Sequence, residues 1–153
     1  MPDLTPAPIR TAGPADLDLI VGIAQACFGL SAWGAAHFAP HPARIIFVAD
    51  SDGARCIGYS VIESIADEAE LQALAVLPEF RRRHFGAALL NAARRHALER
   101  GARTLFLEVR ESNALAQTFY RRFGFTPCGR RPGYYRLPEE TALVMKADLP
   151  ALP

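Results

Sequence analysis

The sequence predicts a mixed α/β fold, with a largely antiparallel central sheet, one parallel pair of strands within it and flanking helices. Two observations carry this prediction. Apolar runs at residues 44–49 and 56–64 are joined by a short polar turn, which is the pattern of an antiparallel β-hairpin. Farther along, residues 70–77, 85–100 and 104–109 have the patterns of a strand, a helix and a strand, and this order predicts a right-handed parallel crossover.

The composition predicts one globular domain spanning residues 1–153. A chain of 153 residues, of which 50% are apolar and 22% are charged, can bury a full core. No repeat or linker divides it, and only the Pro-rich residues 1–7 are expected to fray. The net charge of +1 gives no broad cationic surface, so direct nucleic-acid binding is not expected.

Cysteine and targeting patterns predict a cytoplasmic protein without metal. The three cysteines, Cys27, Cys56 and Cys128, form no CxxC or Cys/His pattern, so neither a disulfide framework nor a metal site is expected. The N-terminus lacks the basic and apolar blocks of a signal peptide. No apolar run approaches the roughly 18 residues of a membrane span, so no membrane association is expected.

In the N-terminal half, residues 9–12 are expected to form a short first strand. A helix is expected from Gly13 to about Phe28, because apolar residues recur there at helical spacing. Ser31 is then expected to cap a short second helix that ends before Pro40.

In the C-terminal half, Ser112 and Asn113 are expected to cap a helix that runs to Phe123, and Gly124 has the C′ position. The tail is expected to form a strand, an aromatic loop and a final strand, at residues 125–130, 133–135 and 141–146.

Three arginines, Arg81, Arg82 and Arg83, stand between the strand at residues 70–77 and the helix that follows it. Backbone N–H groups at a helix N-terminus carry partial positive charge and lack partners within the helix. This corner therefore suits an anion such as phosphate. The alternative is a solvated basic turn without a ligand.

The same corner resembles the acetyl-CoA motif of the GNAT superfamily of N-acetyltransferases, written R/Q-x-x-G-x-G/A. The motif is placed on six residues that follow Arg81: Arg82, Arg83, His84, Phe85, Gly86 and Ala87. A second and more specific stretch, LEVRESNALAQTFYRRFGF at residues 107–125, resembles the RimI-type acetyltransferases. The similarity continues through residues 129–149 and so covers nearly the whole chain.

The resemblance implies that acetyl-CoA is the co-substrate and lies between two parallel strands that splay apart. Its pantetheine would pair with the main chain of Leu74, Ala75 and Val76, and its pyrophosphate would lie on the amides of the motif. Asn113 matches the family's asparagine that hydrogen-bonds the pantetheine arm. The plainer alternatives are a core strand for the first three residues and a simple helix cap for Asn113.

His84 stands where the family usually has glycine, at a tight backbone turn. Glycine adopts positive φ freely, whereas histidine does so only occasionally. Either the loop keeps its path at a cost in strain, or it shifts and binds CoA less well. A third alternative is that the imidazole donates a hydrogen bond to a phosphate.

Glu108 and Tyr120 are the expected catalytic pair. Acetyl transfer to an amine requires a proton to leave the ammonium and a proton to reach the departing thiolate. In the RimI-type family the matching glutamate is the proton acceptor and the matching tyrosine is the donor. Without the resemblance, a strand-end glutamate and a helical tyrosine are more often surface and core residues. A carboxylate is a weak base at neutral pH, so we expect it to act through water or to have its pKa raised by burial.

The chemistry favours an N-terminal α-amine over lysine as the acceptor. With a pKa near 8, about a tenth of an α-amine is neutral at pH 7, against roughly one lysine in a few thousand. The resemblance implies a protein N-terminus, in particular the N-terminal alanine of small-subunit ribosomal protein number eighteen. The aromatic loop with Tyr134, Tyr135, Glu139 and Glu140 resembles the family's acceptor-binding wall, or is an ordinary surface hairpin.

Other functions stay open on the sequence alone. Within the enzyme class, a small amine or another protein N-terminus could be the acceptor. Outside it, the chain could bind CoA without turnover, because His84 perturbs the motif. A nucleic-acid-binding domain is the remaining alternative, opposed by the near-zero net charge. It would use seven arginines: Arg81, Arg82, Arg83, Arg94, Arg95, Arg121 and Arg122.

Overall fold

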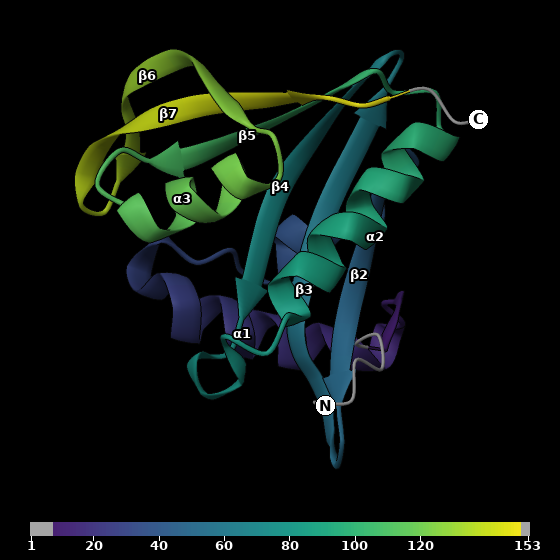
Figure 1. Cartoon of the computed structure of the whole chain (residues 1–153). Coiled ribbons are helices and arrows are strands. Elements are labelled where there is room, and N and C mark those ends of the chain that lie inside the picture. The colour runs from purple at the N-terminus through teal and green to yellow at the C-terminus, as the bar shows by residue number, and fades with distance from the viewer. Residues whose placement is uncertain (1–7, 151–153) are drawn as a thin grey trace. The chain divides into compact units, whose positions relative to one another are not determined.

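The computed structural model describes residues 8–150 and contains a seven-stranded sheet with the order β1-β2-β3-β4-β5-β7-β6 (Figure 1). β4 (Glu68–Val76) and β5 (Thr104–Arg110) pair in parallel, with residues 68–71 opposite residues 104–107. The pairs β1–β2, β5–β7 and β6–β7 are antiparallel, so the predicted fold class is confirmed. The predicted fraying of residues 1–7 lies outside the described residues.

The contacts divide the chain into two compact units. We call Met1–Val61 with Ala73–Ala93 the first unit, and Ile62–Gln72 with Arg94–Pro153 the second unit. The chain passes from one to the other within β3 (Ala54–Ile65), β4 and α2 (Phe85–Glu99), so these three elements contribute residues to both. The single domain expected from composition stays a prediction.

The first unit confirms the strand and helix expected at its start. β1 (Ile9–Thr11) pairs with β2 (Arg44–Ser51), and α1 (Leu17–Phe28) follows a 3₁₀ turn at Pro14–Asp16. Gly29 has a φ of +56°, a left-handed conformation that costs glycine little, and the helix ends there as predicted.

The prediction of a short α-helix after Ser31 is wrong. The segment instead forms two 3₁₀ turns, Gly29–Ser31 and Ala35–Phe38. Gly29 ends the preceding helix and Pro40 blocks continuation, so the stretch between them is too short to nucleate an α-helix of its own. The 3₁₀ form is the usual structure of such short pieces.

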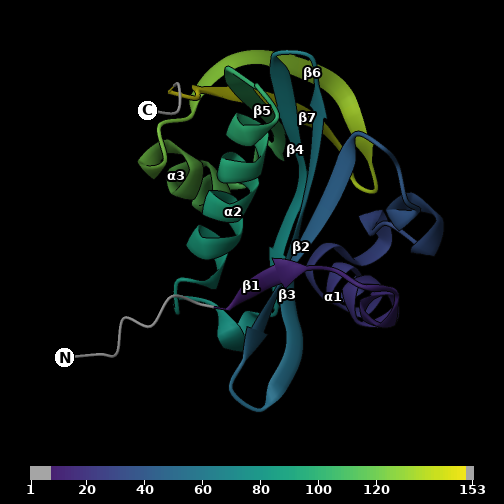
Figure 2. The same ribbon diagram turned by 90° about the vertical axis from the view of Figure 1, so that its right-hand side faces the viewer.

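Apolar side chains form two clusters on opposite faces of the first unit's strands. Ile20 of α1 packs with Val48 of β2 in one cluster, and Leu89 of α2 packs with Ala49 in the other. Neighbouring residues 48 and 49 enter different clusters because strand side chains alternate between faces. Figure 2 shows α1 and α2 on opposite sides of β2 and β3. Each fully buried aliphatic side chain contributes about 1.5–3 kcal/mol.

One segment of the first unit, Pro14–Ser31, is long and apolar enough to cross a membrane by length and composition alone. This differs from the expectation that no apolar run approaches that length. Ile20, Ile23 and Ala24 of the segment are buried in the cluster beside α1, so core packing accounts for part of its apolar character, whereas Leu19, Phe28 and Leu30 are exposed.

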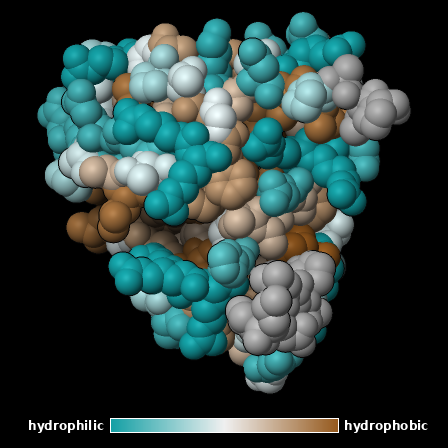
Figure 3. Space-filling model, viewed as in Figure 1, coloured by the Kyte–Doolittle hydropathy of each residue, from teal (hydrophilic) through white to brown (hydrophobic). Residues whose placement is uncertain are grey.

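In the second unit, β5, β7 (Glu139–Asp148) and β6 (Thr126–Arg136) run side by side (Figure 1). Hydrophilic side chains cover most of the β6–β7 hairpin on the face shown in Figure 3. α3 (Ala114–Arg122) ends as predicted, because Gly124 has a φ of +87° and lets the chain leave the helix.

The prediction of an aromatic loop at residues 133–135 is wrong, because these residues belong to β6. The register with β7 shifts between Arg131 and Tyr135, which marks a bulge or irregularity around Pro132. Such irregularities accept proline, which has no N–H to donate to the ladder. The turn between the two strands lies at residues 137–138 instead.

A network of charged side chains joins the start of the first unit to β2. Asp16 is fully buried, and its carboxylate accepts hydrogen bonds from Arg10 Nη1 at 2.8 Å and from the Gly13 N–H at 2.7 Å. Arg10 Nε also donates to Asp50 at 2.7 Å, and Asp50 accepts the N–H of Cys56 at 2.8 Å. The hydrogen bonds from Arg10 hold the pKa of both carboxyls below the ordinary range.

Replacing Asp16 by Asn should lower the free energy of unfolding by about 3 kcal/mol at pH 7, because it breaks a buried ion pair on one side. A carboxyl with a depressed folded pKa stabilises the fold above its unfolded pKa, near 4, and that contribution is lost as the pH falls below it. Urea unfolding at pH 7 and pH 3 measures both effects.

The difference between the parent protein and the Asp16→Asn variant should therefore shrink at pH 3. Arg55→Gln is a matched control, since Arg55 makes one 3.1 Å bond to Asp16 and its side chain is 57% exposed. It should cost less than about 1 kcal/mol. An equal difference at both pH values would contradict the assignment of the acid dependence to Asp16.

Candidate active site

The chain turns from β4 into α2 through a loop with two left-handed residues. A 3₁₀ turn, Pro78–Phe80, follows β4, and Arg82 and His84 then have φ of +61° and +67°. The first helical hydrogen bond joins the Ala88 N–H to the His84 carbonyl at 3.0 Å. The three residues between them therefore have N–H groups with no carbonyl partner in the helix, and these can hold an anion. They are Phe85, Gly86 and Ala87.

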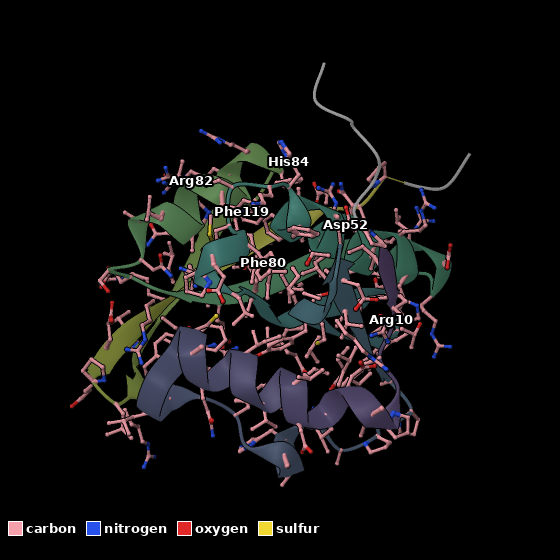
Figure 4. The ribbon with its side chains drawn as sticks, turned by 90° about the horizontal axis from the view of Figure 1, so that it is seen from below. Arg10, Asp52, Phe80, Arg82, His84 and Phe119 are labelled. Carbon is pink, nitrogen blue, oxygen red and sulfur yellow. The ribbon has the colours of Figure 1, made fainter. Side chains whose placement is uncertain are left out.

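His84 keeps the left-handed path that glycine would take at this position. For a residue with a Cβ atom this conformation costs roughly 1–2 kcal/mol. The side chains of His84, Arg82 and Arg83 are exposed, and Figure 4 shows the first two at the outside of the ribbon. The Arg83 guanidinium lies 5.7 Å from the centroid of the Phe80 ring. The loop thus retains the expected backbone turn despite the missing glycine.

Arg81 makes contacts that the sequence did not reveal. Its Nε donates to the Val76 carbonyl at 3.0 Å, and its Nη2 lies 3.5 Å from Cys27 Sγ. With His84 and Gly86 at the two glycine positions, the first position of the motif falls on Arg81. Arg81 therefore ties the start of the loop back to the end of β4.

The side chains at the end of β4 pack in the core. Ala75 is buried in the cluster beside α1, while Leu74 and Val76 pack in the cluster beside α2. A Cβ atom on Gly58 of β3 would lie 2.9 Å from the Ala75 carbonyl oxygen, so only glycine fits there. The three β4 residues lie beyond the segment that pairs with β5, and only their main chain can offer polar groups to a ligand.

Glu108 lies on β5 in the second unit, and its side chain is 12% exposed. Its Oε1 lies 3.1 Å from Arg131 Nε. Burial raises the pKa of Tyr134 on β6, and the nearby Glu108 carboxylate raises it further. Glu108 is thus largely buried, and the Arg131 side chain of β6 holds its carboxylate.

Tyr120 lies on α3 and is half-buried among aromatic rings. Its ring centroid lies 5.3 Å from that of Phe119 and 5.6 Å from that of Phe125. Burial raises the pKa of the Tyr120 phenol, and the neighbouring Tyr135 raises it further. The phenol is therefore protonated at neutral pH and can give a proton but not take one.

Asn113, and not Ser112, is the N-cap of α3. Its Oδ1 accepts the Ala116 N–H at 3.1 Å, so the plainer reading of Asn113 as a helix cap is confirmed. The Ser112 N–H instead donates to the Glu140 carboxylate at 2.6 Å. The cap uses only the oxygen of the Asn113 side chain and leaves the nitrogen as a donor.

Arg110 holds the turn of the β6–β7 hairpin and was not singled out by the sequence. Its guanidinium donates to the carbonyls of Leu137 and Pro138 at 3.2 and 3.0 Å and pairs with Glu140 at 3.2 Å. It also lies 4.3 Å from the centroid of the Tyr135 ring. Two of the four residues that the sequence offered as an acceptor wall, Tyr135 and Glu140, are thus fixed by one arginine.

The expected site residues fall into two groups. The first unit contains the β4 end and the motif loop: Leu74, Ala75, Val76, Arg82, Arg83, His84, Phe85, Gly86 and Ala87. The second unit contains Glu108, Asn113 and Tyr120. Among residues 8–150, no group of three or more His, Cys, Asp or Glu is placed to hold a metal.

The acetyltransferase (GNAT) family model matches residues 20–125, so the chain belongs to the GNAT family of acetyltransferases. It is an acetyl-CoA-dependent N-acetyltransferase of the kind to which the RimI-type enzymes belong.

Its relatives agree with this class. A Bacillus subtilis protein, provisionally named a ribosomal protein bS18-alanine N-acetyltransferase, is 34% identical over 145 residues, which are 92% of this chain and 95% of the relative. The crystal structure of the ribosomal-protein-S18-alanine N-acetyltransferase from Escherichia coli matches with a TM-score of 0.84 and 29% identity over 95% of each chain. The structure of nourseothricin acetyltransferase matches with a TM-score of 0.80 and 29% identity, over 95% of this chain and 100% of that one.

Replacing His84 by Gly should change the dissociation constant of acetyl-CoA by less than about twofold, because glycine follows the same left-handed path. Replacing it by Val should weaken binding by about tenfold, since a β-branched residue is strained at positive φ and would move the amides. Isothermal titration calorimetry measures both. Strong loss of affinity in His84→Gly would show instead that the imidazole itself contacts the cofactor.

Proposed function

We propose that this N-acetyltransferase modifies the N-terminal α-amine of a protein, and that its acceptor is the N-terminal alanine of ribosomal protein bS18. The observation that carries the proposal is the B. subtilis relative, which is similar over 92% of this chain and is named for that reaction. The E. coli structure named for the same acceptor supports it. Such an acceptor implies a cytoplasmic enzyme.

The first unit offers the groups that would hold acetyl-CoA. The amides at the start of α2 would bind the pyrophosphate, because fixed N–H groups lose little entropy on binding. The exposed Arg82, Arg83 and His84 add positive charge or donors beside them. The main chain of residues 74–76 would pair with the pantetheine arm.

Glu108 and Tyr120 are assigned opposite proton-transfer roles. Glu108 takes a proton from the acceptor ammonium, directly or through water, and this frees the nitrogen lone pair to attack the thioester carbonyl. Tyr120 gives its proton to the sulfur of CoA as the carbon–sulfur bond breaks. The nitrogen loses its second proton to solvent as the amide forms, and the products are the N-acetylated acceptor and free CoA. Exchange with solvent then removes the proton from Glu108 and returns one to Tyr120. Burial keeps the Tyr120 phenol protonated at neutral pH, which the donor role requires.

A small amine is the second candidate acceptor. The likeness to nourseothricin acetyltransferase, at 29% identity over 95% of this chain, favours it because that enzyme is named for a small molecule. The two candidates differ in what lies beyond the reacting nitrogen. A peptide continues from the amine as a chain, whereas a small amine leaves the rest of the acceptor site empty.

The acceptor is tested with acetyl-CoA and three substrates: a peptide with the bS18 N-terminal sequence, the same peptide with its α-amine blocked, and nourseothricin. We expect CoA release with the free peptide and a single acetyl group on its α-nitrogen by mass spectrometry. The blocked peptide should react at least about 100-fold more slowly, because any lysine amine in it is rarely neutral. Release with nourseothricin alone would contradict the proposed acceptor.

Replacing Tyr120 by Phe should lower kcat by roughly 10²-fold, because the departing thiolate loses its proton donor. The dissociation constant of acetyl-CoA should stay within about twofold, since the ring is kept. Tyr59→Phe is a matched control, because it removes a hydroxyl from a buried tyrosine of the first unit's core. Normal turnover by Tyr120→Phe would remove Tyr120 from the mechanism.

A further inference from the structure

The ion pair between Glu108 and Arg131 spans an intervening strand. The sheet order is β5-β7-β6, so the two residues lie on strands separated by β7. In the register, Arg131 lies opposite Ala142 of β7, and Ala142 lies opposite Arg110 of β5, two residues from Glu108. Strands two places apart lie about 9–10 Å from each other. Arg131 must therefore extend over the small side chain of Ala142 to place Nε 3.1 Å from Glu108.

The proposed base has acidic neighbours on two other strands. Glu63 is on β3, Glu70 on β4 and Glu108 on β5. Burial raises the pKa of Glu70, the charges of Glu108 and Glu63 raise it further, and Arg131 opposes this shift. In the free enzyme, the positive charge of Arg131 thus offsets part of the negative charge around the proposed base.

The ion pair between Arg131 and Glu108 is weak enough for another cation to displace Arg131. Its side chain is 61% exposed, so water screens the attraction. The guanidinium also has no ionisable proton to give at neutral pH. While Glu108 is paired with Arg131, the carboxylate therefore has no proton to accept and cannot act as the base.

We propose that Arg131 occupies, in the free enzyme, the place that the acceptor's ammonium takes in the reactive complex, and so sets which acceptors bind. This rests on the proposed role of Glu108. An ammonium brings the same charge and N–H donors to the carboxylate, and unlike the guanidinium it carries a proton that Glu108 can remove. An acceptor without a cation, such as an alcohol, offers nothing to offset the loss of the Arg131 pair and is excluded.

Steady-state kinetics with a free α-amine peptide test the proposal. Replacing Arg131 by Gln should lower the KM for the peptide by roughly three- to tenfold, because the acceptor no longer competes with an internal cation. The kcat and the KM for acetyl-CoA should change by less than about twofold. Arg131→Lys keeps the charge and should keep most of the high KM.

Arg130→Gln is the matched control. Arg130 has the same 61% exposed side chain and also forms an ion pair, but with Glu111. It alternates to the opposite face of β6, so its loss changes the net charge equally without reaching Glu108. The peptide KM of this variant should equal that of the parent. Methylguanidinium should inhibit Arg131→Gln competitively with the peptide and affect the parent far less, which a purely structural role would not produce.

The two proposals fail separately. Normal turnover by Glu108→Gln would remove Glu108 as the base and, with it, the displacement. Slow turnover by Glu108→Gln together with an unchanged or raised peptide KM in Arg131→Gln would overturn the displacement alone. An equal fall in KM in Arg130→Gln would also overturn it, since a general charge effect would then be responsible.

Discussion

Burial of the first unit's strands on both faces is the constraint on which the rest of the structure depends. With α1 on one face and α2 on the other, alternate side chains of β4 enter different cores, and none is left to bind a ligand. Only the main chain of residues 74–76 can offer polar groups there. The same logic applies at the start of α2, where helix geometry leaves N–H groups without partners. Backbone groups are thus what this unit can offer a cofactor.

The second unit has the opposite arrangement, and it holds the side chains able to transfer protons. On β5, Leu107 and Val109 are buried, so Glu108 between them points to the other face. That face carries Arg131 from β6, whose guanidinium reaches the carboxylate across a small residue of β7. A carboxylate on a strand is well positioned, because its backbone is fixed by pairing, here between Glu108 and Val144 of β7.

The hairpin, the crossover and the helix end at Gly124 could be predicted because each is encoded by neighbouring residues. The orientation of Glu108 was equally accessible, since alternation follows from the strand alone. The contacts of Arg131 and Arg110 were not, because they depend on β6 lying beyond β7, an order that the chain does not state. The passage of β6 through Pro132 was missed because proline usually marks a break, and only pairing with β7 makes a bulge there possible.

Residues other than glycine that adopt the left-handed backbone conformation link the fold to its proposed chemistry. At Cys56 the strained backbone is offset within the protein, because its N–H donates to the partly buried Asp50 at 2.8 Å. Arg82 and His84 adopt the same conformation beside the unpaired amides of α2. Strain that the surrounding structure maintains at such a place is a reason to infer function, and an anion on these amides is the interaction that would offset it. The first unit then keeps its amides oriented at a cost in stability, and a histidine can stand where glycine is usual.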